Sequence, residues 1–235
     1  MIYPAFTWPH IIYLVIFALL IAGGCFFFLN KKISEKSKDI VIRILAGITV
    51  AAVITKQVSF VIEHVDLGES NAWVYAFPNS YCSFSALLLG ILVLCGDKNG
   101  FAMHFLVYNV LIGCTPSVIY PDYLNSKPFF AYGTMGSLVF HMLAVVICIL
   151  LIVKKDFKPT LKKWYCFPIG FAVMLGFGFL LVYGFGSGDA MNITKPLISD
   201  IKFSYWYTLF PLCWALAVLL TLLLSKLSYR SNKKQ

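Results

Sequence analysis

The sequence predicts an all-α integral membrane protein, a bundle of seven transmembrane helices with its N-terminus outside and its C-terminus in the cytoplasm. Of its 235 residues, 60% are hydrophobic and only 12% are charged, whereas soluble domains carry about 25% charged residues. Seven apolar stretches reach the roughly 20 residues that a helix needs to cross the hydrocarbon. Lysine and arginine gather in alternate loops. We therefore expect a single domain over residues 1–235, with many passes through the cell membrane.

The seven predicted spans are bounded by residues typical of helix ends at a membrane surface. No Lys or Arg precedes the first span, which argues against a cleaved signal peptide. Pro121 and Pro128 bracket the loop between the fourth and fifth spans. Tryptophan and tyrosine near the ends form the aromatic belt expected at the interface. The spans cover residues 10–29, 40–65, 76–96, 101–120, 129–153, 164–186 and 204–227.

The distribution of positive charge sets the predicted orientation. Loops one, three and five together with the C-terminal tail hold 14 Lys and Arg residues, and loops two, four and six hold 3. Positive residues concentrate on the cytoplasmic side of membrane proteins. The alternation requires an odd number of spans, with the N-terminus outside. It also explains the net charge of +9 without nucleic-acid binding.

The cysteines do not form a recognisable metal-binding or disulfide pattern. There are seven, no two of them in a CxxC pair, and most lie within apolar runs. Structural zinc sites and disulfide frameworks need closer or more regular spacing. The sequence therefore predicts no metal site and no cofactor, with membrane lipids as partners; it identifies no protein partner.

Lys56 and Glu63 are charged residues within the second predicted span. They are seven residues apart, and Thr49, Ala52 and Ser59 share their face of the helix. Ionisable residues inside a span are costly and mark candidate functional sites. We expect Lys56 to face the bundle interior, near Ser59, Glu63 or a polar group of another helix. An ordinary ion pair near the surface is the simpler expectation for Glu63.

Two histidines lie within predicted spans. His141 is in the middle of the fifth, where Ser137 lies one turn before it on the same face. An imidazole in hydrocarbon needs polar partners, so His141 is a candidate functional residue. His104 begins the fourth span and is expected at the membrane interface.

Cys82 lies near the outer end of the third predicted span in an unusually polar stretch, with Asn79 and Ser83 close by. A thiol becomes reactive beside a base or a positive charge. His141 and Lys56 could supply these from neighbouring helices. Counted along the spans, Cys82 and His141 differ in depth by ~9 Å at 1.5 Å per residue, and a shift in either helix start would change this difference.

Several short motifs, taken in order, resemble the YwaF-type integral membrane proteins, whose eukaryotic relative is called transmembrane protein 164. Residues 77–82 (Phe-Pro-Asn-Ser-Tyr-Cys) resemble the family's Leu-Pro-x-x-x-Cys at the start of the third helix. The other matching segments are residues 113–116, 120–122, 129–141, 189–196 and 206–207. Members often carry a histidine where this chain has Ser80, and Asn-Tyr-Met where it has Asp189-Ala190-Met191.

The resemblance implies a phospholipid acyltransferase that uses a cysteine and a histidine, here Cys82 and His141. In this interpretation, His141 takes the thiol proton and the thiolate of Cys82 accepts a fatty acyl chain from one phospholipid, as a thioester, before passing it to another lipid. Lys56, Asn79, Ser83 and Ser137 are the expected supporting or substrate-binding residues, with Asn79 and Ser83 as candidate oxyanion donors.

The alternative is a protein without catalytic activity, a small-solute transporter or a binding subunit, in which Lys56, Glu63 and His141 line a polar cavity. Contact between Cys82 and His141 would favour the enzyme, and a Cys82 that faces lipid would favour transport. A retinal photoreceptor is excluded because the seventh predicted span has no lysine before Lys226, at its end.

Overall fold

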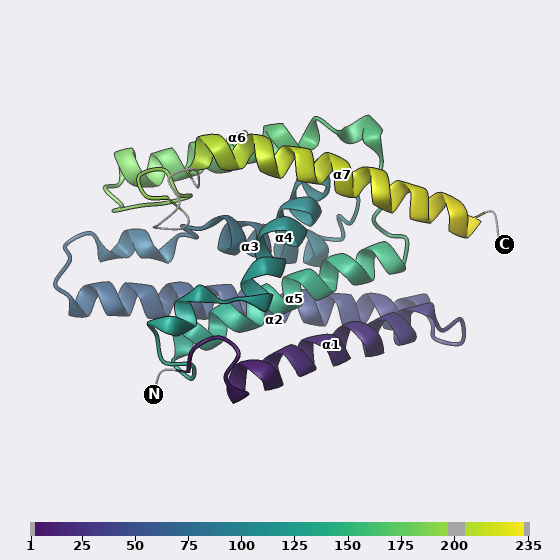
Figure 1. The fold of residues 1–235 in the computed structure, drawn as a ribbon, viewed down its shortest axis with the longest axis horizontal. Coiled ribbons are helices and arrows are strands. Elements are labelled where there is room, and N and C mark those ends of the chain that lie inside the picture. The colour runs from purple at the N-terminus through teal and green to yellow at the C-terminus, as the bar shows by residue number, and fades with distance from the viewer. Residues whose placement is uncertain (1–2, 197–204, 233–235) are drawn as a thin grey trace.

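Seven α-helices form one bundle in the computed structural model, which describes residues 3–196 and 205–232 (Figure 1). Within these residues the structure contains six candidate membrane spans; α3 is too short to be one of them, and α6 belongs to the longer helical stretch Leu161–Gly184. The predicted start of the last span at residue 204 lies outside the described residues. The helices are α1 (Trp8–Leu29), α2 (Glu35–Asp66), α3 (Tyr81–Cys95), α4 (Phe101–Ile119), α5 (Tyr132–Val153), α6 (Cys166–Phe179) and α7 (Trp206–Asn232).

Helix α5 is the central element of the bundle. Within its most apolar window 78% of the residues are buried, against 11% in α1 and in α7. Its most extensive contact is with α2. In Figure 1, α1 lies on one side of the bundle and α7 on the other. The isoleucine, leucine and phenylalanine side chains that α1 and α7 expose suit contact with lipid, because an apolar surface of this size is unfavourable in water.

Glycines bring α2 close to its neighbours. A Cβ atom added to Gly136 of α5 would lie 2.8 Å from the carbonyl oxygen of Ala52, and one added to Gly90 of α3 would lie 3.1 Å from that of Ala46. Small residues at such positions let helix backbones approach closely, which is the main source of packing energy in membranes. The position of α2 against α3 and α5 is therefore fixed by backbone contact.

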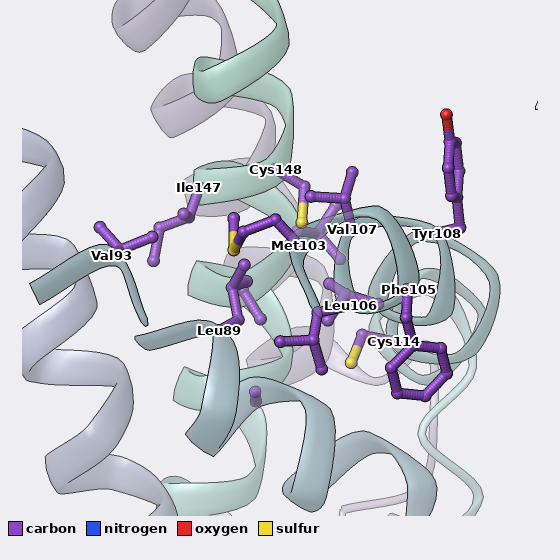
Figure 2. Close-up of a cluster of buried hydrophobic side chains, with 14 of the residues drawn as sticks. Leu89, Val93, Met103, Phe105, Leu106, Val107, Tyr108, Cys114, Ile147 and Cys148 are labelled. Atoms are coloured by element: carbon purple, nitrogen blue, oxygen red, sulfur yellow. The ribbon is translucent and has the colours of Figure 1, made fainter. Parts of the chain in front are cut away.

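The interior between α3, α4 and α5 is filled by apolar side chains. Figure 2 shows Leu89 of α3, Met103 and Leu106 of α4 and Ile147 of α5 lying together. Asn109 is one polar residue within this region, and its side-chain amide donates to the Ser85 hydroxyl at 2.7 Å. The cluster holds α3 and α4 in register with α5.

Charged residues crosslink one end of the bundle, which we call the lysine-rich end (loop residues 30–34, 96–100 and 154–165). Lys154 contacts Asp39 at 2.6 Å and Asp156 at 2.9 Å, and Lys98 contacts Asp39 at 2.7 Å. Burial opposes the charge on Lys154, but its hydrogen bonds to Asp39 and Asp156 raise its pKa above the ordinary value. The network therefore stays ionised at neutral pH and joins α2 to the loops after α3 and α5.

The third helix is shorter than the predicted span of residues 76–96. The 3₁₀ helix η1 (Ala72–Ala76) and an extended stretch precede it, and α3 itself has 15 residues, about 22 Å at 1.5 Å per residue. The Ser80 side chain caps its N-terminus by accepting from the Ser83 amide, and Gly96 ends it in the left-handed conformation at φ 90°. The chain thus enters the bundle as non-helical backbone before α3 begins.

Neighbouring segments satisfy this non-helical backbone. The Gln57 side-chain amide donates to the Phe77 carbonyl, and the Met191 amide donates to the Asn79 carbonyl at 2.9 Å. The Tyr81 hydroxyl donates in turn to the Met191 carbonyl at 2.6 Å. Irregular backbone at membrane depth is tolerated where protein groups supply its hydrogen bonds. The loop between α6 and α7, which contains Met191, therefore holds the start of α3 in place.

Candidate functional site: a thiol and imidazole cluster

Three chemically reactive side chains meet inside the bundle. The sulfur atoms of Cys82 and Cys114 and a ring nitrogen of His141 all lie within 4.8 Å of one another. They come from α3, α4 and α5 respectively. Cys114 and His141 are buried, whereas Cys82 is partly exposed. The structure thus brings together the two residues to which the sequence assigns catalysis, and adds Cys114.

The start of α3 explains how the expected difference in depth disappears. Cys82 is the second residue of α3 and His141 the tenth of α5. Since η1 and the extended residues cover the first part of the path into the bundle, α3 begins level with the middle of α5. The sequence prediction counted residues 76–80 as helix and so placed Cys82 too near the membrane surface, because extended backbone covers more depth per residue than a helix does.

One nitrogen of His141 is fixed by the backbone. Its Nδ1 lies 2.7 Å from the Ser137 carbonyl oxygen. A carbonyl only accepts hydrogen bonds, so Nδ1 carries the proton and donates it in the neutral ring, which leaves Nε2 with a free lone pair. Ser137 therefore contributes through its backbone, as the residue that sets the tautomer of His141.

Cys82 has several polar neighbours. The ligand atoms of Cys114 and His141 lie within 4.8 Å of its sulfur, Ser117 is also near it, and Gly113 leaves room beside it, since a Cβ at that position would lie 3.4 Å from the sulfur. At the first turn of α3, Cys82 also lies in the positive field of a helix N-terminus. The positive field of the helix N-terminus favours the thiolate, which is the nucleophilic form.

Lys56 faces the interior of the bundle, as the sequence predicts. Its side chain is buried, and its ammonium lies 4.8 Å from the centre of the Phe60 ring and 5.9 Å from that of Phe140. It is also close enough to Cys82 for their charges to interact. No carboxylate among the described residues pairs with it. Glu63 instead forms an exposed ion pair with Lys127 at 2.6 Å.

The other two predicted supporting residues have structural contacts. Ser83 is fully buried, and its hydroxyl lies 2.7 Å from that of Ser80 within the helix cap. The carbonyl of Asn79 accepts from the Met191 amide. Neither contact directs these residues at the thiol, although both help to fix the first turn of α3.

Sequence reasoning did not select three residues of the cluster: Cys114, Ser117 and Tyr123. Tyr123, in the 3₁₀ helix η2 (Asp122–Asn125), stacks against His141 with ring centres 6.2 Å apart. Its buried hydroxyl approaches Ser137 without reaching hydrogen-bond geometry. One signal in the sequence was Pro116, which lies inside α4 two residues after Cys114 and has no N–H to donate to the Ile112 carbonyl.

The same three atoms could hold a metal ion. Zinc binds cysteine sulfur at about 2.3 Å and histidine nitrogen at about 2.0 Å, so two sulfurs and a nitrogen this close could share one ion after small side-chain movements. The sequence predicted no metal because the three ligands come from separate helices and their spacing follows no motif.

The fold and this cluster define a multi-pass membrane protein with a buried cysteine and histidine site. The TMEM164 family model matches residues 5–227, and the chain belongs to the TMEM164 family. No curated protein and no solved structure gives a significant match.

Proposed function

We propose that this protein transfers fatty acyl chains between lipids through a thioester on Cys82. The observation that carries the proposal is the proximity of Cys82 to His141, whose Nδ1 is held by the Ser137 carbonyl so that Nε2 is free to accept a proton. The alternative of a transporter predicts that Cys82 faces lipid, whereas its sulfur lies within 4.8 Å of a ring nitrogen of His141. The family resemblance of residues 77–82 and 129–141 supports the same function.

The proposed reaction has two halves. His141 Nε2 takes the thiol proton, and the thiolate attacks the ester carbonyl of a phospholipid. The carbon–oxygen bond breaks, the departing alcohol receives the proton from His141, and the acyl chain remains on Cys82. The hydroxyl of an acceptor lipid then attacks the thioester as His141 removes its proton. The carbon–sulfur bond breaks, and the proton returns from His141 to the sulfur.

The oxyanion formed in each half needs hydrogen-bond donors. In the described part of the chain, no hydrogen bond uses the backbone N–H of Tyr81 or Cys82. These groups lie at the N-terminus of α3, where amides without helix partners and the helix dipole favour negative charge. We assign the oxyanion to these amides in place of Asn79 and Ser83, which the sequence suggested.

Lys56 has an electrostatic role in this mechanism. A buried ammonium without a carboxylate partner stabilises negative charge on the sulfur more strongly than an exposed one, because the surroundings screen it less. It would favour both the thiolate and the oxyanion.

The test uses purified protein in lipid nanodiscs with a phosphatidylcholine that carries a labelled acyl chain. Wild type should form a labelled, hydroxylamine-sensitive adduct on the peptide that contains Cys82 and release labelled product to a lysophospholipid. Cys82→Ala should abolish both, and His141→Ala should lower the rate of adduct formation at least ~100-fold. Cys95→Ala, at the opposite end of α3, is the matched control and should behave as wild type.

A thiophilic metal centre is the second candidate function, favoured by the same cluster of three ligand atoms. Metal analysis of the purified protein distinguishes the two. One equivalent of bound zinc that is lost in both Cys114→Ala and His141→Ala, without any acyl adduct in wild type, would overturn the acyltransferase proposal in favour of a metal site.

A further inference from the structure

Cys114 is a buried nucleophile that the proposed reaction does not use. It lies on α4 as part of the apolar cluster of the interior, and its side chain is fully buried (Figure 2). A free cysteine in such a place usually acts only as a small apolar side chain. Its sulfur, however, lies within 4.8 Å of both the Cys82 sulfur and a ring nitrogen of His141. A thiol beside a base and a second nucleophile can take part in chemistry as well as in packing.

The two sulfurs are close enough to exchange an acyl chain. In a thioester on Cys82, the carbonyl carbon is bonded directly to a sulfur that lies within 4.8 Å of the Cys114 sulfur. A nucleophile and a carbonyl carbon react from about 3–3.5 Å, a distance that side-chain rotation about χ1 can provide while both helices stay in place. Gly113 leaves room for this movement, because a Cβ atom there would lie 3.4 Å from the Cys82 sulfur.

His141 can act as the base for either thiol. Its Nδ1 donates to the Ser137 carbonyl at 2.7 Å, so Nε2 is the nitrogen that accepts a proton. After the first half of the proposed reaction, His141 has given its proton to the departing alcohol and is neutral again. The imidazole is then free to remove the thiol proton of Cys114, which makes Cys114 a nucleophile while the acyl chain is still on Cys82.

We propose that Cys114 takes the acyl chain over from Cys82 and later returns it, an inference that rests on the acyl transfer proposed above. His141 Nε2 removes the Cys114 thiol proton, and the thiolate attacks the carbonyl carbon of the Cys82 thioester. The carbon–sulfur bond to Cys114 forms, the one to Cys82 breaks, and the proton passes from His141 to the Cys82 sulfur. One thioester replaces another, so the step needs no further reactant and runs in both directions.

The exchange separates the two halves of the reaction. The amides assigned to the oxyanion lie at the N-terminus of α3, beside Cys82, so an alcohol attacks the thioester at that position. While the chain is on Cys114, the lipid alcohol released in the first half cannot reclaim it. Cys114 thus stores the acyl chain in covalent form while one lipid leaves and another arrives.

Peptide mapping of the acyl-enzyme tests the proposal on the full chain. Protein in nanodiscs with the labelled phosphatidylcholine, without an acceptor, is quenched in acid and digested with pepsin, because low pH removes the thiolates that could move the label after unfolding. Mass spectrometry should find hydroxylamine-sensitive label on both the Cys82 and the Cys114 peptides of wild type. Cys82→Ala should lose the label at both positions, and Cys114→Ala should keep it on Cys82.

Cys114→Ser provides a trap for the chain. The new hydroxyl at position 114 should take the chain as an oxygen ester, which resists neutral hydroxylamine and does not return the chain to a thiol. Label should therefore accumulate at position 114, and transfer to a lysophospholipid should fall below that of Cys114→Ala. Cys148→Ser is the matched control and should behave as wild type, because Cys148 is buried in the same apolar cluster but lies outside the group of three reactive atoms.

The outcomes separate this inference from the proposed function. Label on Cys82 together with product formation, but never at position 114 in wild type or in Cys114→Ser, would overturn the exchange and leave the acyltransferase proposal intact. Label at Cys114 in Cys82→Ala would also overturn the exchange, because the chain would then come directly from the lipid. Wild type without label on either cysteine would overturn both proposals.

Discussion

At the scale of single residues, the site depends on polar side chains that are rare in an apolar chain. Cys82, His141 and Lys56 could be selected from the sequence because each interrupts or flanks an apolar span with a polar face. Cys114 could not, since it resembles the other cysteines in apolar runs until the packing of α4 against α3 is known. Tyr123 lies in a loop, and its stacking on His141 depends entirely on tertiary structure.

Lys56 should control the reactivity of the Cys82 thiol. In Lys56→Met the side chain keeps its length but loses its charge, so the thiolate loses a favourable interaction in a poorly screened interior. We expect alkylation of Cys82 by iodoacetamide at neutral pH to slow at least about fivefold. Peptide mapping by mass spectrometry measures this rate.

Cys95 serves as the internal control for the alkylation experiment, because it is exposed and lies at the other end of α3. Its labelling should not change. A Cys82 rate equal to that of wild type would show that the ammonium does not act on the sulfur.

At the scale of elements, the decisive feature is the late start of α3. The sequence predicted all seven helices, and most of their observed ends lie within a few residues of the prediction. It missed the entry of α3 because it extended the apolar span back to residue 76, while the conformation of residues 76–80 depends on hydrogen bonds from Gln57 and Met191, far away in the chain. Periodicity carries no information about such partners.

The close contact between α2 and α5 should be sensitive to a single added methyl group. In Gly136→Ala the new Cβ would lie 2.8 Å from the Ala52 carbonyl oxygen, so the two helices must separate. We expect a loss of about 2 kcal/mol in stability and a lower melting temperature in detergent, measured by intrinsic fluorescence.

Gly47→Ala is the matched control on α2, because nothing lies within 4 Å of its added Cβ. It should be neutral or slightly stabilising, since alanine favours helix by up to about 1 kcal/mol. Equal melting temperatures for the two variants would mean that the backbone contact at Gly136 does not limit stability.

At the scale of the whole molecule, the start of α1 and the end of α7 lie at opposite ends of the bundle (Figure 1). The seven crossings that the lysine distribution predicts would place these helix ends on opposite sides in this way. The apolar surface of α1 and α7 explains how a chain of this composition stays folded, because its solvent is lipid. The composition and the apolar stretches of the sequence were enough to predict a multi-pass membrane protein, without any sequence motif.

Orientation in the membrane is testable with reporter fusions. We expect fusions after residues 36, 160 and 230 to report a cytoplasmic location and one after residue 70 to report the opposite side, following the positive-inside rule. An external signal at residue 160 or 230 would reverse the assignment.

The adjacent sulfurs of Cys82 and Cys114 make the site sensitive to its redox environment. A mild thiol oxidant such as diamide would remove one hydrogen from each and join them as a disulfide, which leaves no thiolate to attack an ester. Dithiothreitol would restore both thiols. Preparations exposed to air should therefore lose mass by two hydrogens and lose labelling of Cys82 together, while Cys114→Ala should resist this inactivation.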